Sequence, residues 1–294
     1  MPEKSVITLD PHLPVVLAGS CFSQNMASKM KAHLWKAVNP LGTLYNPVSI
    51  CQALDIMLDE KEGSNRFENS LFHHNGIWNS CKFDSSFSSQ DKNDCIEDFE
   101  NKGIILRDAL QEGRQLIVTF GTSFVYYFSD TGEAVGNCHK LPSQRFFRER
   151  LSVTEISATW KGMIEKLNVL YPEIKIIFTV SPVRHLKDGF VGNMRSKAVL
   201  SLGIESIVRE NPGCQYFPAY EILNDDLRDY RFYASDLAHP SEEAIEYVWG
   251  KFLDTFVDKQ GIQILTEGAS KYKAERHRPK TGALGKPIEK GIHP

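Results

Sequence analysis

The chain has 294 residues, of which 41% are hydrophobic and 24% charged, so it is long enough to bury one large core. Its formal net charge is −3 and its pI is near 6.3, without the basic excess typical of nucleic-acid-binding proteins. We therefore expect no nucleic-acid partner.

Targeting and cross-linking signals are also missing from the sequence. No stretch has the apolar length of a signal peptide or a membrane span. The six cysteines lack the paired spacing of a disulfide framework or of a common metal site. We expect a cytoplasmic protein without a membrane span and without a cofactor.

Residues 15–23 predict a buried strand followed by a helix. A valine-rich run ends at Gly19, and the next segment repeats apolar residues every four positions, at Phe22, Met26, Met30 and Leu34. Ser20 and Cys21 therefore lie in a strand-to-helix turn, where open α/β sheets place their chemistry. Because a helix N-terminus favours the thiolate, we expect a lowered pKa for Cys21.

A turn-rich loop with two prolines follows at residues 39–47, and then a helix that Asn46 is expected to cap. Residues 61–95 interrupt this regularity, since they mix Ser, Asn and Asp with aromatic residues. Two readings stay open for this inserted segment: a solvated excursion, or a lid or substrate wall in which Trp78 contacts the substrate.

Helices and strands then alternate to residue 265. Apolar runs predict strands at residues 115–120, 175–180 and 215–220. Periodicity and capping signals predict helices that end near residue 113, open at the capping box of Ser152 and Glu155, run from about 196 to 211, and start at Pro240.

This alternation predicts an α/β fold: a three-layer α/β/α, flavodoxin-like domain over residues 1–265, with a mostly parallel sheet of about five strands. From residue 266 the apolar periodicity stops and basic residues gather around prolines and glycines. We therefore expect residues 266–294 to form an extended tail outside the core.

The order of three blocks resembles the SGNH (GDSL-type) esterase superfamily: Gly-Ser-Cys-Phe-Ser at 19–23, Gly-Thr-Ser at 121–123, and Asp-x-x-His-Pro at 236–240. Within it, Asn-Cys-His-Lys at 137–140 and Thr-Val-Ser-Pro-Val-Arg at 179–184 are similar to the GSCFA family, a little-characterised bacterial group. The resemblance covers roughly residues 10 to 257.

The resemblance implies acyl-ester chemistry by a nucleophile, a histidine and an aspartate. In this chain the aspartate is Asp236 and the histidine is His239. Alignment on Gly19 puts Cys21 at the nucleophile position, where the superfamily has serine, so either Cys21 attacks as a thiol or Ser20 attacks from a shifted register.

The resemblance also implies an oxyanion hole of backbone and amide N–H groups. Gly42 matches the glycine. Ser123 stands at the position of the expected asparagine, so either Asn137 supplies the missing amide from the next loop or the oxyanion hole is weaker. We add His139 and Arg184 as substrate-binding candidates, with Arg184 as an anchor for a carboxylate or phosphate.

Three function classes follow from these residues. The first is an ester hydrolase or acyltransferase, acting on a small-molecule or glycan ester such as an acylated carbohydrate. The second is a catalytically inactive carbohydrate- or ligand-binding descendant, in which Asp236 and His239 only cap a helix. The third is a metal site drawn from cysteine and histidine side chains, namely Cys21, Cys138, His139, His185 and His239.

Overall fold

The computed structural model describes residues 5–277, and its centre is a five-stranded sheet. The strands are β1 (Val15–Gly19), β2 (Ala37–Val38), β5 (Gln115–Phe120), β9 (Lys175–Val180) and β10 (Cys214–Phe217). All pairs are parallel, in the order β2-β1-β5-β9-β10. This is the flavodoxin-like order. The chain adds β2 on one side of β1 and then β5, β9 and β10 on the other side, so the strand order reverses between β1 and β5.

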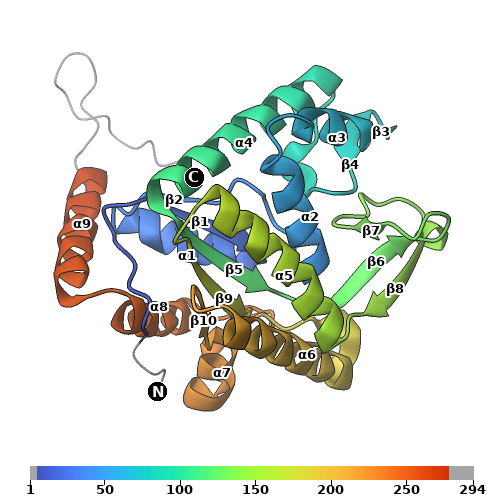
Figure 1. The fold of residues 1–294 in the computed structure, drawn as a ribbon. Coiled ribbons are helices and arrows are strands. Elements are labelled where there is room, and N and C mark those ends of the chain that lie inside the picture. Colours follow the sequence, from blue (N-terminus) through green and yellow to red (C-terminus); the bar gives the residue numbers. More distant parts are fainter. Residues whose placement is uncertain (1–4, 278–294) are drawn as a thin grey trace, which may run out of the picture.

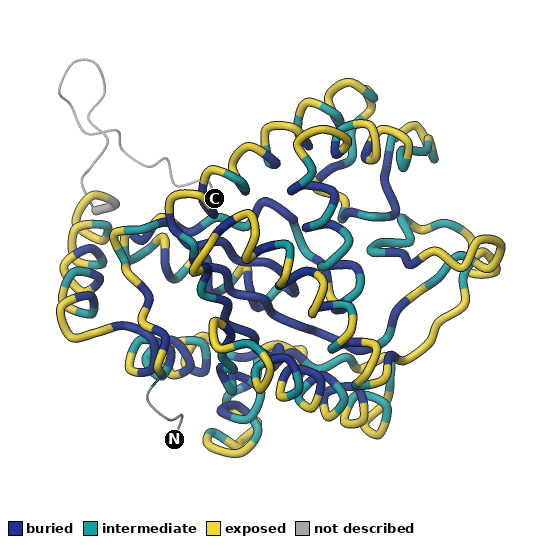
Figure 2. Tube along the Cα trace, in the orientation of Figure 1, coloured by how far each residue is buried: buried dark blue, intermediate teal, exposed yellow. Residues whose placement is uncertain are grey.

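Alternate residues of each strand feed two separate cores, and the strands are the buried centre of the tube in Figure 2. Val16 and Ala18 of β1 pack under α2 (Pro47–Met57), α4 (Lys92–Gly113), α5 (Val153–Leu170) and α6 (Gly189–Glu210). Val15 and Leu17 pack under α1 (Cys21–Ala32) and α8 (Glu242–Phe256) on the other face (Figure 1). The predicted three-layer α/β/α fold is confirmed.

Several helix boundaries follow the local signals in the sequence. The side chain of Asn46 accepts the N–H of Ser49 at 2.8 Å and caps α2, and Ser152 and Glu155 form both halves of a capping box at the start of α5. In contrast, α6 begins at Gly189, seven residues before the predicted start. Its first two turns carry exposed apolar side chains, so no core-facing stripe marks them.

The inserted segment at residues 61–95 is folded onto the core. It contains α3 (Gly63–Asn69), the hairpin of β3 (Leu71–His74) and β4 (Ile77–Ser80), and a 3-10 turn (Ser85–Phe87). Phe67, Phe83 and Phe87 are buried and pack with Phe99 of α4. These aromatic side chains are therefore part of the hydrophobic core.

A three-stranded antiparallel sheet, absent from the sequence expectations, projects beside the layers (Figure 1). It joins β6 (Phe124–Phe128), β7 (Ala134–Val135) and β8 (Phe146–Arg150). Aromatic residues occur on both faces of this arm, as where Tyr127 stacks on Phe147 at 5.2 Å, so the strands lack the alternation of polar and apolar residues that a half-buried strand shows.

The last described helix corrects the expected tail. A short helix, α7 (Ala219–Glu221), follows β10, and α9 (Lys259–His277) follows α8, so residues 266–277 are helical rather than extended. Gly268 faces the end of α1, where an added Cβ would lie 2.3 Å from the carbonyl oxygen of His33. Residues 278–294 of the expected tail lie outside the described residues. Between residues 5 and 277, no helix is long and apolar enough to cross a membrane.

Candidate active site

Cys21, His239 and Asp236 meet at the carboxyl edge of the sheet. Cys21 is the first residue of α1, two positions after the last residue of β1, and its Sγ lies 3.6 Å from Nε2 of His239. Nδ1 of the same ring lies 2.6 Å from Oδ2 of Asp236, in the loop before α8. The side chains of His239 and Asp236 are 47% and 50% exposed, so this chain of contacts opens to solvent. Parallel α/β sheets bind ligands at this reversal of strand order.

Ser20 has a different position from Cys21. Its side chain is the N-cap of α1, where Oγ accepts the N–H of Phe22 at 3.3 Å, and the residue is only 1% exposed. The contact of His239 is with the sulfur of Cys21. The geometry therefore favours Cys21 over Ser20 as the reacting group.

The pKa values of Cys21 and Asp236 are both shifted from their ordinary values. Burial raises the pKa of the Cys21 thiol, and this outweighs the backbone N–H groups of α1 and the charge of Lys197, which lower it. The expected low pKa is therefore wrong, because desolvation exceeds the effect of the helix N-terminus. Hydrogen bonds from the N–H groups of His239 and Ala238 lower the pKa of Asp236 to about 2.

Lys197 is a buried titratable group beneath the site that the sequence analysis missed. It lies within α6, is 1% exposed, and donates Nζ hydrogen bonds at 2.7 Å to the carbonyl oxygens of Gly121 and Ser181, which follow β5 and β9. Burial lowers its pKa to about 7, and Cys21 is the first of the charged groups that oppose this shift. Its signal in the sequence is a lysine at a core-facing position of a helix.

Tyr45 and His185 complete the wall beside the triad. Their rings meet edge to face at 5.9 Å, and the carbonyl oxygen of Tyr45 accepts the N–H groups of Gly121 and Thr122 at 2.7 and 3.0 Å. Burial, followed by the charge of Lys197, lowers the pKa of His185 to about 4, so this ring is neutral at pH 7. The charge of His239 contributes to the same shift, which sets the two histidines near each other.

The oxyanion candidates fall in different places. Gly42 lies in the loop that pairs with the end of β1, where Thr43 bridges to Gly19. It has φ of +70°, and an added Cβ would meet the carboxylate of Asp84 at 2.4 Å, so this position requires glycine. Ser123 is fully buried and bonds to Ser196 of α6 through both its N–H and its hydroxyl. Ser123 is therefore excluded as an oxyanion donor.

His139 has a structural role in the loop at residues 137–139. Oδ1 of Asn137 accepts the N–H of His139 at 2.9 Å. Nε2 of His139 lies 2.8 and 3.1 Å from the carbonyl oxygens of Ser80 and Phe83, so the ring ties this loop to the inserted segment. Nε2 of His139 is therefore used within the fold, and substrate binding by this residue stays a prediction.

Trp78 supports the β3–β4 hairpin. Its ring packs against the core and contacts His73 at 5.3 Å and the amine of Lys92 at 5.7 Å. Substrate binding by Trp78 stays a prediction.

The described residues offer no set of metal ligands of the predicted kind. Within residues 5–277, no three His, Cys, Asp or Glu side chains converge in a way that could hold a metal ion. His139, one of the five residues proposed for it, is bound to two backbone carbonyls. The Cys and His residues therefore do not form the predicted metal site.

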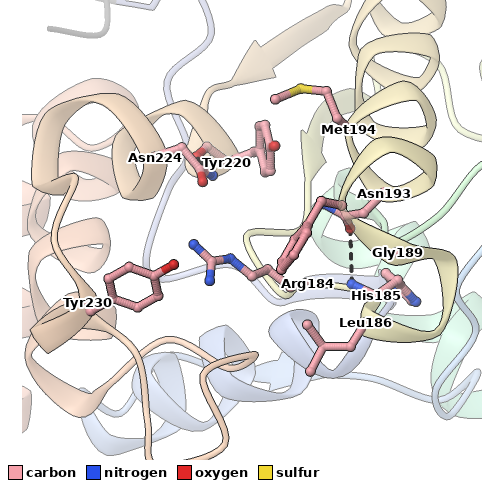
Figure 3. Close-up of a pocket in the computed structure, with 10 residues that line it drawn as sticks. Arg184, His185, Leu186, Gly189, Asn193, Met194, Tyr220, Asn224 and Tyr230 are labelled. Atoms are coloured by element: carbon pink, nitrogen blue, oxygen red, sulfur yellow. Dashed lines mark hydrogen bonds between the residues drawn. The ribbon is translucent and has the colours of Figure 1, made fainter.

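A cavity of about 420 Å³ lies between the start of α6 and residues 220–230 (Figure 3). It is lined by Arg184 and His185, by residues of α6, and by Tyr220, Asn224 and Tyr230 on the opposite side. The N–H of Arg184 donates to the carbonyl oxygen of Ala238 at 3.0 Å, and so joins the cavity wall to the loop that carries His239. Concave sites of this size, with few polar groups, are typical of small-molecule binding.

Comparison with known proteins places the chain in a family. No curated protein sequence matches it. Among solved structures it is similar to an acetyl xylan esterase (Est2A) from the rumen bacterium Butyrivibrio proteoclasticus, with a TM-score of 0.41 and 12% sequence identity. That match covers 86% of this chain and 64% of the esterase, so the chain spans somewhat less than two thirds of its length. The model of the GSCFA family matches residues 14–252, and the chain therefore belongs to the GSCFA family.

Proposed function

We propose that this protein is an ester hydrolase or acyltransferase of the SGNH type, with Cys21 as nucleophile, His239 as general base and Asp236 as the group that orients the base. The observation that supports this is the continuous chain of contacts from Cys21 Sγ to His239 Nε2 at 3.6 Å and from His239 Nδ1 to Asp236 at 2.6 Å. A nucleophile, a base and an orienting carboxylate in this order define the triad arrangement in hydrolases of unrelated folds.

The chemistry begins with a neutral thiol, because burial raises the pKa of Cys21. As Sγ attacks the carbonyl carbon of the ester, His239 Nε2 takes the thiol proton and the carbonyl π electrons move to oxygen. When the tetrahedral intermediate collapses, the C–O bond breaks and His239 returns the proton to the leaving alcohol. A thioester on Cys21 remains.

The second half of the cycle releases the acyl group. Water, or the hydroxyl of an acceptor, gives a proton to His239 and attacks the thioester carbonyl. Collapse of the second intermediate expels the Cys21 sulfur, which regains that proton. Water as acceptor gives hydrolysis, and another alcohol gives acyl transfer.

For the oxyanion we assign the N–H of Cys21, at the first turn of α1, with Gly42 and Asn137 as the further candidates. Gly42 is supported by its place in the loop pinned beside Gly19. Asn137 is supported by the hydrogen bond of its Oδ1 to His139, which leaves the amide NH₂ as the group it can offer.

The rival reading treats Asp236 and His239 as a helix-capping pair in a binding protein. Oδ1 of Asp236 does accept the N–H groups of Ala238 and His239, both at 2.9 Å, as a capping side chain would. Capping does not require the other oxygen to hold the imidazole, nor the imidazole to reach a cysteine. These two additional contacts favour the catalytic proposal.

The test is acylation of Cys21. Incubation with p-nitrophenyl acetate, followed by mass spectrometry, is expected to show a thioester on the peptide that carries Cys21, absent in Cys21→Ala. Ser20→Ala is the matched neighbouring control: it should remain acylated and lose about 1 kcal/mol of stability as a helix cap. Acetylated sugars follow as substrates, because the SGNH resemblance implies carbohydrate esters. If no panel member acylates Cys21, the ligand-binding reading replaces this proposal.

A further inference from the structure

Arg184 enters the cavity of Figure 3 without an acidic partner. Its guanidinium lies 3.9 Å from the ring centroid of Tyr233 and 5.3 Å from that of Tyr230. Nη1 also reaches the carbonyl oxygen of Leu237 at 3.4 Å. Among residues 5–277, no carboxylate forms an ion pair with Arg184. Stacking on aromatic faces holds the guanidinium plane but leaves most of its five N–H donors for a ligand.

The opposite part of the cavity is apolar and exposed. Phe190, Met194 and Leu186 line it, and they are 84%, 60% and 54% exposed. Figure 3 shows Leu186 and Met194 on either side of the Arg184 stem, with the guanidinium extending toward Tyr230. Apolar side chains left exposed together around a cavity are typical of a ligand-binding surface.

The two amide side chains of the cavity are bonded within the fold. Asn224 donates to the carbonyl oxygen of Tyr220 at 2.8 Å and accepts the hydroxyl of Tyr233 at 3.3 Å. Oδ1 of Asn193 accepts the N–H of His185 at 3.0 Å. Among the described residues that line the cavity, Arg184 is the one that is charged at pH 7, so the charge offered to a ligand there is positive.

Resting on the proposed function, we propose that this cavity binds a substrate part in which an anionic group, a carboxylate or a phosphate, adjoins an apolar segment. Arg184 takes the anion between the two tyrosine rings, and Phe190, Met194 and Leu186 cover the apolar segment. The neighbouring loop then presents the ester to Cys21, since Arg184 is bonded through its backbone to Ala238, next to His239. The substrate class is thus an ester of an amphipathic anion.

The test is equilibrium binding of simple probes to the full chain carrying Cys21→Ala, measured by titration calorimetry. The probes are hexyl phosphate and hexanoate, which separate the two anions, with 1-hexanol and glucose pentaacetate as neutral comparisons. Arg184→Met removes the charge at similar length. Arg145→Met is the matched control, because Arg145 is also stacked on an aromatic ring, Phe128 at 5.5 Å, on the projecting arm.

We expect at least one anionic probe to bind and to lose on the order of tenfold or more in affinity in Arg184→Met, but not in Arg145→Met. The same binding should weaken as salt increases. In Phe190→Ser, hexyl phosphate should weaken while methyl phosphate stays unchanged, and the high exposure of Phe190 keeps this variant folded.

Equal binding of the anions to wild-type and Arg184→Met cavities would overturn the proposal, as would neutral probes that bind as tightly as the anions, or no binding of either anion. Because the readout involves no turnover, the two proposals fail separately. Anion binding that depends on Arg184 without acylation of Cys21 supports the cavity and contradicts the esterase. Acylation of Cys21 with no anion binding does the reverse.

Discussion

One carboxylate, that of Asp236, fixes both the backbone and the ring of His239. Its Oδ1 accepts the N–H of His239 at 2.9 Å, and its Oδ2 lies 2.6 Å from Nδ1 of the same residue. If Nδ1 carries the proton and donates it to this carboxylate, Nε2 is the accepting nitrogen, which is the tautomer that the proposed mechanism requires. The two functions of Asp236 can be separated by substitution, because an amide oxygen can still accept the backbone N–H.

Asp236→Asn should therefore keep the fold and lose acyl transfer. The amide can keep the backbone hydrogen bonds, but its NH₂ cannot accept the Nδ1 proton, so the ring takes the wrong tautomer. The comparable change in a serine protease lowers turnover about 10⁴-fold, and we expect a loss of that order in kcat/KM for p-nitrophenyl acetate. Asp226→Asn, which affects a carboxylate bonded to Tyr247, is the control. A fully active Asp236→Asn would leave only the capping role.

His239→Ala should be slow at neutral pH and recover as the pH is raised. Burial raises the pKa of Cys21, so at pH 7 the thiol needs a base, and loss of the base should lower acylation about 10²–10⁴-fold. Above the raised pKa the thiolate forms without help, so the variant should approach wild-type rates. Stopped-flow acylation from pH 6 to 10 measures this, with the exposed His12→Ala as control. A variant rate that does not change with pH would be inconsistent with a thiol nucleophile.

Lys197 should make stability depend on pH. Its pKa is about 7 in the folded chain, below the ordinary 10.5, so between these values the unfolded chain binds the proton and the folded chain does not. Stability therefore increases with pH across this window, by at most about 1.4 kcal/mol per pH unit. Below pH 7 both states are protonated and the slope vanishes. A neutral amine retains two N–H groups, enough for the carbonyl oxygens of Gly121 and Ser181.

Urea unfolding of wild type and Lys197→Met at pH 6, 7, 8 and 9 isolates this contribution, since the other titrating groups are common to both. From pH 7 to 9 the free energy of unfolding of the wild type should increase relative to that of Lys197→Met. A difference that is constant over the range would mean that Lys197 titrates like an exposed lysine.

Two glycines in neighbouring helices should respond oppositely to alanine. In α9, a Cβ on Gly268 would lie 2.3 Å from the carbonyl oxygen of His33, so Gly268→Ala should destabilise by about 1–3 kcal/mol. In α8, a Cβ on Gly250 meets nothing within 4 Å, so Gly250→Ala should stabilise by about 0.5–1 kcal/mol through helix propensity. Thermal unfolding measures both. A neutral Gly268→Ala would show that α9 does not pack tightly on α1.

The sequence predicts those parts of the fold whose signals are local. The three inner strands β1, β5 and β9 are almost completely buried and appear as apolar runs, while α2 and α5 begin at capping residues that need no tertiary information. The edge strand β2 has only two residues, carries no such run and is not predicted from the sequence. The projecting arm has no such local signal, because its aromatic residues lie on both faces of the sheet. The first turns of α6 also lack one, since their apolar residues are exposed.

The site residues also differ in how far the sequence predicts them. Cys21, Asp236 and His239 come from segments that the family resemblance orders, and the structure brings them together. Lys197 lies at a core-facing position of α6, but a lysine in a helix is ordinarily assigned to the surface, so only the structure establishes its burial. His139 and Ser123 have side chains suited to catalysis, but the fold uses their polar atoms for internal bonds.

The contact between Cys21 and His239 joins residues that are 218 positions apart. During synthesis the thiol is therefore made 218 residues before the imidazole that it contacts. If Cys21 is the nucleophile, as proposed above, a nascent chain that has not reached His239 has no general base for it and should not form acyl intermediates. In that mechanism the reactivity of Cys21 depends on the folding step that brings the two distant segments together.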